Sequence, residues 1–198
     1  MFREKSHRIE NRIVSIHQPW VRPIVRGKAT ADVEFGAKIA ISMVDGYAAI
    51  ERLDWDAYNE SVDLIETIER HKTRTGQYPE RILADKIYRT RKNLQYCETH
   101  HIRFNGPKLG RPPQNKALYN EQKRLEKQES GEWNAVEGKF GEGKRFYSLG
   151  RVMTRLKNTS EVSIHMTFLV MNLEKRLRDF IFRFYQWLYR HLLPEHIA

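Results

Sequence analysis

Asp85 is the first residue of this sequence whose type and position could do chemistry. It stands in ILADKIY, directly after residues 81–84, which predict a short strand. α/β folds commonly place functional groups at the C-terminal ends of such strands, because these ends converge on a shared crevice. The structural alternative is that Asp85 only caps the following turn or pairs with Lys86. Position alone leaves both interpretations open.

Glu137 is the second candidate, in the segment VEGKFGEGK. Val136 and Phe140 lie one turn apart and favour a helix here, although the glycines at 138, 141 and 143 weaken that prediction. Three cations follow that could bind phosphates: Lys139, Lys144 and Arg145. The structural alternative is a solvated surface glutamate, because Glu is seldom buried unless it is paired.

Cys97, His100 and His101 lie close together and raise the question of zinc. Structural zinc sites need paired ligands at regular spacing, which one cysteine with two adjacent histidines lacks. We therefore expect no zinc site here.

The elements that must position Asp85 begin with a hairpin. Apolar residues alternate over Phe35 to Met43 and predict a strand, and Ala48 to Leu53 is its returning partner. The pair Asp45-Gly46 between them suits a two-residue turn with positive φ.

Helices alternate with strands after this hairpin. A helix capped by Asn59 and ended by Gly76 and Pro79 precedes the strand at 81–84, and a second helix over 90–100 precedes a strand at 102–104. The resulting order ββαβαβ predicts an α/β fold built on one core.

The remainder of the chain is a loop followed by helices. Residues 106–115, GPKLGRPPQN, predict a surface loop, residues 115–129 a polar helix, and residues 160–193 a long amphipathic helix. The amphipathic stripe of that long helix is Val162, Met166, Leu169, Leu173, Leu177, Phe180, Phe184 and Trp187. Its aromatic residues are expected to pack against the core, or alternatively to form a dimer surface; they are Phe180, Phe182, Phe184, Tyr185, Trp187 and Tyr189.

Composition favours a polyanionic partner. The chain has 198 residues, a formal net charge of +10 and a pI near 9.7, which suits nucleic acid, with anionic membrane as the competing partner. Residues 45–70 are acidic and residues 139–157 are basic. No spanning segment, signal peptide or cysteine pair is evident, so we expect a cytoplasmic protein.

At this point the sequence resembles a known family, the bacterial insertion-sequence transposases of the insertion-sequence-five-like group. The resemblance covers roughly residues 11–178. It is carried by RIVSIHQPWVRPIVRGK at 12–28, VEFGAKI at 33–39, ILADKIYRT at 82–90, WNAVEGKFGEGKR at 133–145 and LVMNLEKRLR at 169–178. It implies a ribonuclease H-like mixed sheet with flanking helices, an Asp, Asp, Glu triad, and DNA as the partner.

By this resemblance Asp85 is the second catalytic carboxylate and Glu137 the third. The chemistry needs Mg²⁺ (or Mn²⁺) held by such carboxylates during in-line displacement at a phosphodiester. The resemblance further implies a partial catalytic domain at 1–158, with a basic insertion at about 105–130, and a long C-terminal helix at 159–198 packing on it.

The main departure from the family is its first aspartate. That residue ends the first core strand, and no strand followed by Asp precedes Arg12. Asp45 is better explained as a turn residue. We therefore expect a C-terminal fragment that lacks the first core strand and is inactive alone. A smaller departure is Trp133, where the family tends to have a basic residue.

Ten basic residues are the candidates for DNA contact, through phosphates more than bases. They are Arg22, Arg26, Lys28, Arg89, Arg91, Lys108, Arg111, Lys139, Lys144 and Arg145.

Three hypotheses stay open. The first is a transposase remnant that binds DNA without cutting it. The second is a non-catalytic DNA-binding protein that competes for element ends. The third is a chain that pairs with an upstream transposase fragment supplying the missing aspartate, or with a second copy of itself.

Overall fold

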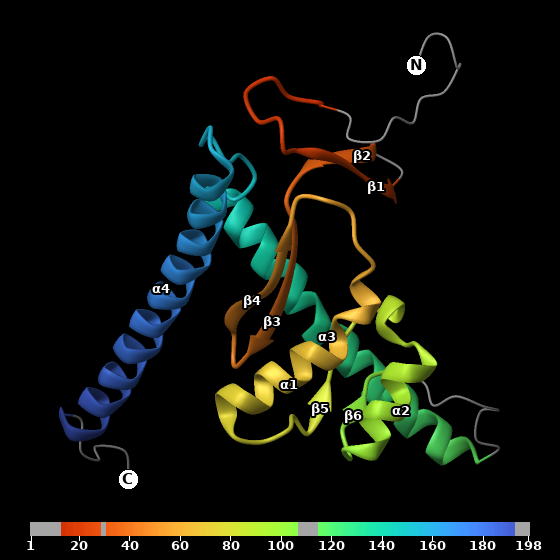
Figure 1. Cartoon of the computed structure of the whole chain (residues 1–198). Helices are drawn as coiled ribbons and strands as arrows, with labels where there is room; N and C mark the ends of the chain where they lie inside the picture. The colour runs from red at the N-terminus through yellow and green to blue at the C-terminus, as the bar shows by residue number, and fades with distance from the viewer. Residues whose placement is uncertain (1–12, 29–30, 107–114, 193–198) are drawn as a thin grey trace. The chain divides into compact units, whose positions relative to one another are not determined.

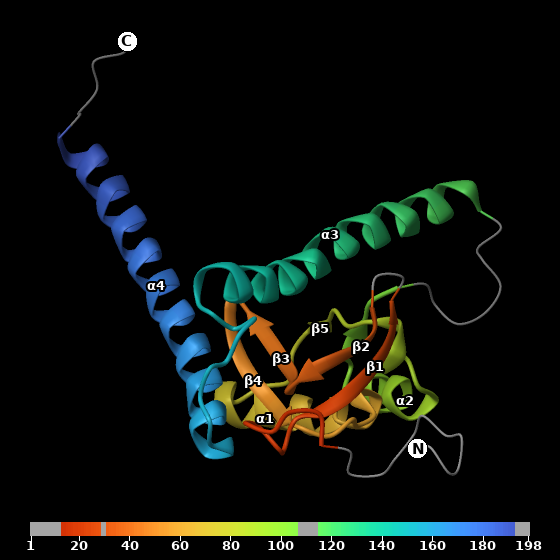
Figure 2. The ribbon, with the colours of Figure 1, turned by 90° about the horizontal axis from the view of Figure 1, so that it is seen from above.

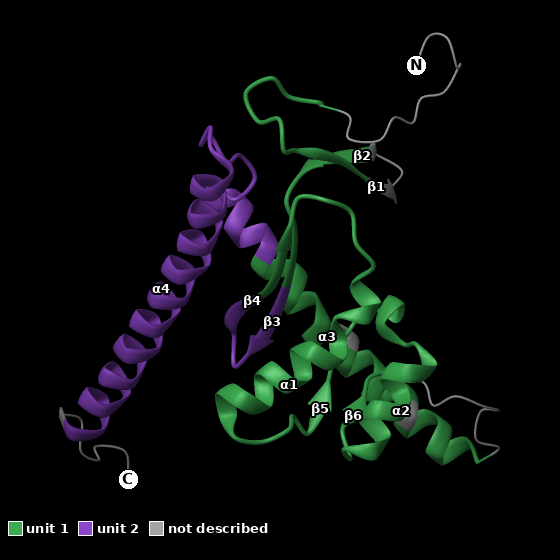
Figure 3. Cartoon of the chain, in the orientation of Figure 1, with its two compact units in different colours: residues 1–40, 51–139 green, residues 41–50, 140–198 purple. Residues whose placement is uncertain are grey.

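The computed structural model describes residues 13–28, 31–106 and 115–192 (Figure 1). These fall into two compact units (Figure 3). Unit 1 comprises residues 1–40 and 51–139, and unit 2 comprises residues 41–50 and 140–198. The predicted α/β class is confirmed in its coarse form, because strands and helices alternate along the chain. The expected division at residue 158 stays a prediction.

Six strands form three separate two-stranded sheets within the described residues. β1 (Arg22–Lys28) pairs antiparallel with β2 (Ala31–Gly36), β3 (Lys38–Val44) pairs with β4 (Tyr47–Asp54), and β5 (Arg81–Ile82) pairs in parallel with β6 (Arg103–Phe104). The strand expected over 35–43 is therefore divided between two sheets. The break falls after Gly36, whose φ of 145° is a conformation that L side chains rarely adopt.

The hairpin predicted around Asp45-Gly46 is confirmed. Asp45 has φ 51° and Gly46 has φ 80°, the pair of positive values that a type I′ turn requires. Asp45 thus has the turn role expected for it.

Two helices build the core of unit 1. α1 (Leu64–Thr75) ends at Gly76 with φ 82°, and α2 (Arg91–Thr99) begins at the cap Thr90, whose hydroxyl accepts the Asn93 N–H at 3.2 Å. Asn59 caps a short 3₁₀ turn, η1 (Glu60–Val62), instead of α1 itself. The side chains at the centre of this core are Leu64, Ile68, Cys97 and Ile102.

α3 (Lys116–Phe146) is one continuous helix of 31 residues (Figure 2). It includes all three glycines that weakened the helix prediction around Glu137. At Gly143 an added Cβ would lie 2.9 Å from Leu149 Cδ2 and 3.4 Å from Met171 Sδ. This glycine is therefore explained by close packing inside unit 2 and not by a break in the helix.

α4 (Lys157–Leu192) confirms the predicted long helix but buries a different face. Ser160, Ile164, Phe168 and Met171 are 0 to 3% exposed, whereas the eight residues of the predicted stripe are 48 to 66% exposed. The face packed within unit 2 is therefore not this stripe, and the expected packing of the helix on the catalytic domain stays a prediction. Both faces carry apolar residues at helical spacing, so the periodicity does not choose between them.

Candidate functional site

Asp85 lies three residues beyond the end of β5 and is exposed. Its side chain caps η2 (Lys86–Tyr88) through a hydrogen bond from the Lys86 N–H to Oδ1, and its carbonyl oxygen accepts the Tyr88 N–H at 3.0 Å. The capping role foreseen as the structural alternative is therefore real. It does not exclude a ligand, because the cap uses one carboxylate oxygen of two.

Asn105 positions the chain that leads to Asp85. Its Oδ1 accepts the Ala84 N–H at 3.1 Å and its Nδ2 donates to the Ala84 carbonyl at 3.0 Å. The last backbone hydrogen bond between the two segments runs from the Asn105 N–H to the Ile82 carbonyl at 3.0 Å. The side-chain amide of Asn105 continues this pairing beyond the end of β5 and β6. Sequence reasoning missed Asn105, because its partner Ala84 is 21 residues away.

Glu137 lies on α3 and is exposed. The same helix is joined to the β5–β6 sheet by two ion pairs, Arg103 to Glu129 at 2.7 Å and Arg81 to Glu132 at 2.6 Å. Glu137 follows Glu132 by five residues, or about 7.5 Å along the helix axis. Asp85 and Glu137 are therefore both carried by elements that contact this sheet, within unit 1.

The candidate metal ligands are the two carboxylates Asp85 and Glu137. Among the residues that the structure describes, no group of three or more His, Cys, Asp or Glu side chains could hold a metal ion. Mg²⁺ in proteins is often bound by one or two carboxylates together with substrate phosphates and water. Two exposed carboxylates are compatible with that donor set.

The ten predicted DNA-binding residues lie in different environments. Arg91, Lys144 and Arg145 are exposed, whereas Lys139 is only 6% exposed. Arg22 is half-buried and donates to the carbonyl oxygens of its neighbours at positions 19 and 21. The side chains of Arg26 and Lys28, and all of Lys108 and Arg111, lie outside the described residues.

Arg89 has a structural partner that the sequence did not reveal. Its guanidinium donates to the Asn105 carbonyl and lies 5.5 Å from the centroid of the Phe104 ring. It therefore holds the end of β6, next to the chain that positions Asp85.

A cluster of polar and aromatic side chains joins α1 to α2. Tyr78 and Tyr96 both donate their hydroxyls to Glu69, and both rings lie 4.4 Å from the ring of His100. The hydroxyl of Tyr96, and then that of Tyr78, lowers the pKa of Glu69 below its usual value. Burial raises the pKa of the nearby Cys97 thiol, which suits a core residue more than a reactive one.

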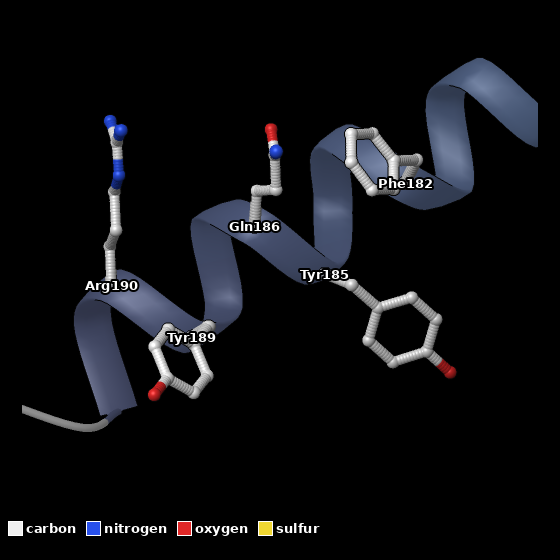
Figure 4. Close-up of a pocket in the computed structure, with 5 residues that line it drawn as sticks. All are labelled: Phe182, Tyr185, Gln186, Tyr189 and Arg190. Atoms are coloured by element: carbon white, nitrogen blue, oxygen red, sulfur yellow. The ribbon is translucent and has the colours of Figure 1, made fainter.

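A shallow hollow of about 300 Å³ occurs at the C-terminal end of α4 (Figure 4). Its walls come from successive turns of this one helix, and they are Phe182, Tyr185, Gln186, Tyr189 and Arg190. None of the carboxylates discussed above contributes to it.

Comparison with known protein families matches the region that carries both carboxylates. Residues 82–174 match the family model of the transposase DDE domain. The match begins in β5 and ends in α4, so it includes Asp85 and Glu137, and it supports a DDE transposase. No curated protein and no solved structure matched the chain. Among the described residues, no helix combines the length and apolar character needed to cross a membrane.

Proposed function

We propose that this chain is part of a bacterial insertion-sequence transposase, with Asp85 as the second and Glu137 as the third carboxylate of the catalytic triad. The observation that carries the proposal is the match to the transposase DDE domain over 82–174. Two features support it. Asp85 is exposed just beyond a parallel strand, and Glu137 is exposed on the helix whose ion pairs bind that strand's sheet.

The residues fit Mg²⁺ or Mn²⁺ as the metal. Carboxylate oxygens are hard ligands of the kind that these ions prefer, and DNA phosphates would complete the coordination. A bound divalent ion would activate the attacking oxygen and stabilise the leaving oxygen during transfer of the phosphodiester. Asp85 and Glu137 would hold it, with Asn105 acting as a positioning residue for Asp85.

DNA binding would rest on the exposed cations. Arg91 stands in the first turn of α2, where unpaired backbone N–H groups also favour a phosphate, and Lys144 and Arg145 end α3. Arg89 contributes less in this account, because it is engaged with β6.

The first carboxylate of the triad has no assigned position in these 198 residues. We therefore infer that it would come from polypeptide outside them, and that this chain alone binds DNA but does not cut it. The second hypothesis is a DNA-binding protein that occupies element ends without cutting, and the experiments below distinguish it from a transposase fragment.

Fluorescence anisotropy with a labelled DNA duplex tests the binding. We expect affinity to fall steeply with salt, by roughly 10³-fold or more between 50 and 200 mM if six or more phosphates are contacted. Arg91→Gln should weaken binding and reduce the log–log salt slope by about 1. The matched control is Lys72→Gln, an exposed lysine of α1 outside the predicted set. Equal effects of the two substitutions would contradict the assignment.

A nicking assay with Mn²⁺ then separates the hypotheses. On DNA carrying the element's ends, we expect no cleavage by this chain alone. If this chain alone cleaves the DNA, and cleavage is lost in both Asp85→Asn and Glu137→Gln, its active site is complete. That result would contradict the inference that the chain is inactive alone. If a preceding segment is added and restores cleavage, the non-catalytic hypothesis fails.

A further inference from the structure

Charged side chains attach α3 to the β5–β6 sheet. Glu129 pairs with Arg103 at 2.7 Å, and Glu132 pairs with Arg81 at 2.6 Å. The two arginines are paired residues of the parallel strands, and the two glutamates are three residues apart, which places them on one side of the helix. Each strand of this sheet therefore makes one ion pair with the same side of α3.

Glu129 is the most enclosed part of this attachment. Of the α3 side chains described between residues 116 and 138, it is the only buried one, at 5% exposure. A buried carboxylate is strongly unfavourable unless it is paired and hydrogen-bonded. Arg103 supplies the opposite charge, and the Gly106 N–H donates to the second carboxylate oxygen at 3.3 Å. A displacement of α3 would separate Glu129 from both partners, so this residue resists it.

The apolar cluster that packs β5 and β6 against α1 and α2 has no member from α3 among the described residues. Its side chains, and the partly buried ones packed against them, all come from residues 64–104. α3 therefore does not take its position from that cluster. Hydrogen-bonded ion pairs are directional, so the two pairs to the sheet can fix both the height and the rotation of the helix.

Glu129 is connected to both proposed metal ligands. Glu137 lies in the same continuous helix, eight residues or about 12 Å further along its axis, so any shift of α3 moves it. The residue before Asp85 is held by the side chain of Asn105. The next residue after Asn105 is Gly106, whose N–H binds Glu129. Glu129 thus joins the helix that carries Glu137 to the segment that holds the chain before Asp85.

We propose that Glu129, with Arg103 as its counter-charge, is a positioning residue that holds Glu137 where it can bind the same divalent ion as Asp85. It acts through the position of Glu137 and not by contact with the ion. This inference rests on the proposed function, because it requires that Asp85 and Glu137 bind the ion. Residues one step removed from the ligands typically change metal affinity by roughly 10- to 100-fold when they are substituted.

Mn²⁺ titration followed by electron paramagnetic resonance, with a DNA duplex bound, tests the proposal. We expect the affinity for Mn²⁺ to fall at least about tenfold in Glu129→Ala. It should be unchanged in the matched control Glu121→Ala, an exposed glutamate of the same helix. In the Glu137→Gln background, Glu129→Ala should cause no further loss, because residues that act through one another are not additive. Fully additive losses would overturn the proposal.

A distance measurement without metal reads the position of α3 itself. Cys97 is 2% exposed and should not react, so spin labels can be attached at Gln95→Cys on α2 and at Asn134→Cys on α3, both exposed. We expect one narrow distance between the labels, which becomes broader or shifts in Arg103→Gln. Arg103 is half-exposed and outside the apolar cluster, so this variant should stay folded. An unchanged distance would overturn the proposal.

The two measurements distinguish failure of this inference from failure of the proposed function. If Asp85→Asn and Glu137→Gln leave Mn²⁺ binding unaffected, the proposed function has failed, and the positioning role fails with it even where the distance changes. If both substitutions weaken Mn²⁺ binding and Glu129→Ala does not, the proposed function stands and the positioning role of Glu129 is wrong.

Discussion

At the scale of single residues, Asp85 has two roles that substitution can separate. Its Oδ1 caps η2, a role that an asparagine oxygen can also fill, whereas metal binding needs the negative charge. We predict that Asp85→Asn keeps the wild-type free energy of unfolding, while Asp85→Ala loses about 1 kcal/mol with the cap. Urea unfolding measures both. Equal losses in the two variants would show that the cap depends on the charge.

Glu69 should make the stability of unit 1 depend on pH. Its pKa is lowered from 4.5 by the Tyr96 and Tyr78 hydroxyls, so it binds a proton less readily when folded than when unfolded. The stabilisation is present above pH 4.5 and is lost as the pH falls below it. We predict that Glu69→Gln, which keeps an oxygen acceptor, shows a smaller loss of stability on acidification from pH 7 to 4. An unchanged acid dependence would contradict this.

How far the sequence predicted the site differs from residue to residue. Type and neighbourhood single out Asp85 and Glu137, and both are exposed. Glu137 lies on a helix as expected, whereas Asp85 lies three residues beyond the strand that was expected to end next to it. Arg89, Lys139 and Asn105 could not be placed correctly, because their environments depend on residues or helix faces that only the fold brings near.

At the scale of elements, we expect substitutions of two glycines of α3 by alanine to have different effects on stability. An added Cβ at Gly138 meets nothing within 4 Å, whereas at Gly143 it meets Leu149 Cδ2 at 2.9 Å. We predict that Gly138→Ala stabilises the chain by up to about 1 kcal/mol through helix propensity. Gly143→Ala should not stabilise the chain in this way, because the added methyl group clashes with Leu149. Thermal unfolding of the two variants tests this, and equal shifts would argue against the packing at Gly143.

Local signals predicted the turns and caps well. The Asp45-Gly46 turn, the end of α1 at Gly76 and the cap Thr90 all depend on residues within a few positions of one another. The face of α4 that is buried within unit 2 could not be predicted, because it is selected by the hairpin residue Ala48 and by the end of α3, which are remote in sequence.

At the scale of the whole molecule, the order of elements was predictable from the β3–β4 hairpin onwards, but the β1–β2 hairpin and the arrangement of the sheets were not. The sequence indicated alternating strands and helices, and the structure has them. The parallel pairing of β5 with β6 joins residues 22 positions apart through two-residue strands. Both strands were predicted, but periodicity carries no information on which strands share a sheet.

The central claim is that Asp85 and Glu137 hold one divalent metal ion. Iron-directed cleavage tests it most directly: Fe²⁺ replaces Mg²⁺, and ascorbate with peroxide then generates hydroxyl radicals that cut the backbone beside the ion. With a DNA duplex present, we predict cuts near residues 85 and 137, lost in Asp85→Asn and in Glu137→Gln but kept in Glu121→Gln, an exposed carboxylate of α3. Cuts elsewhere, or cuts that persist in both site variants, would contradict the account.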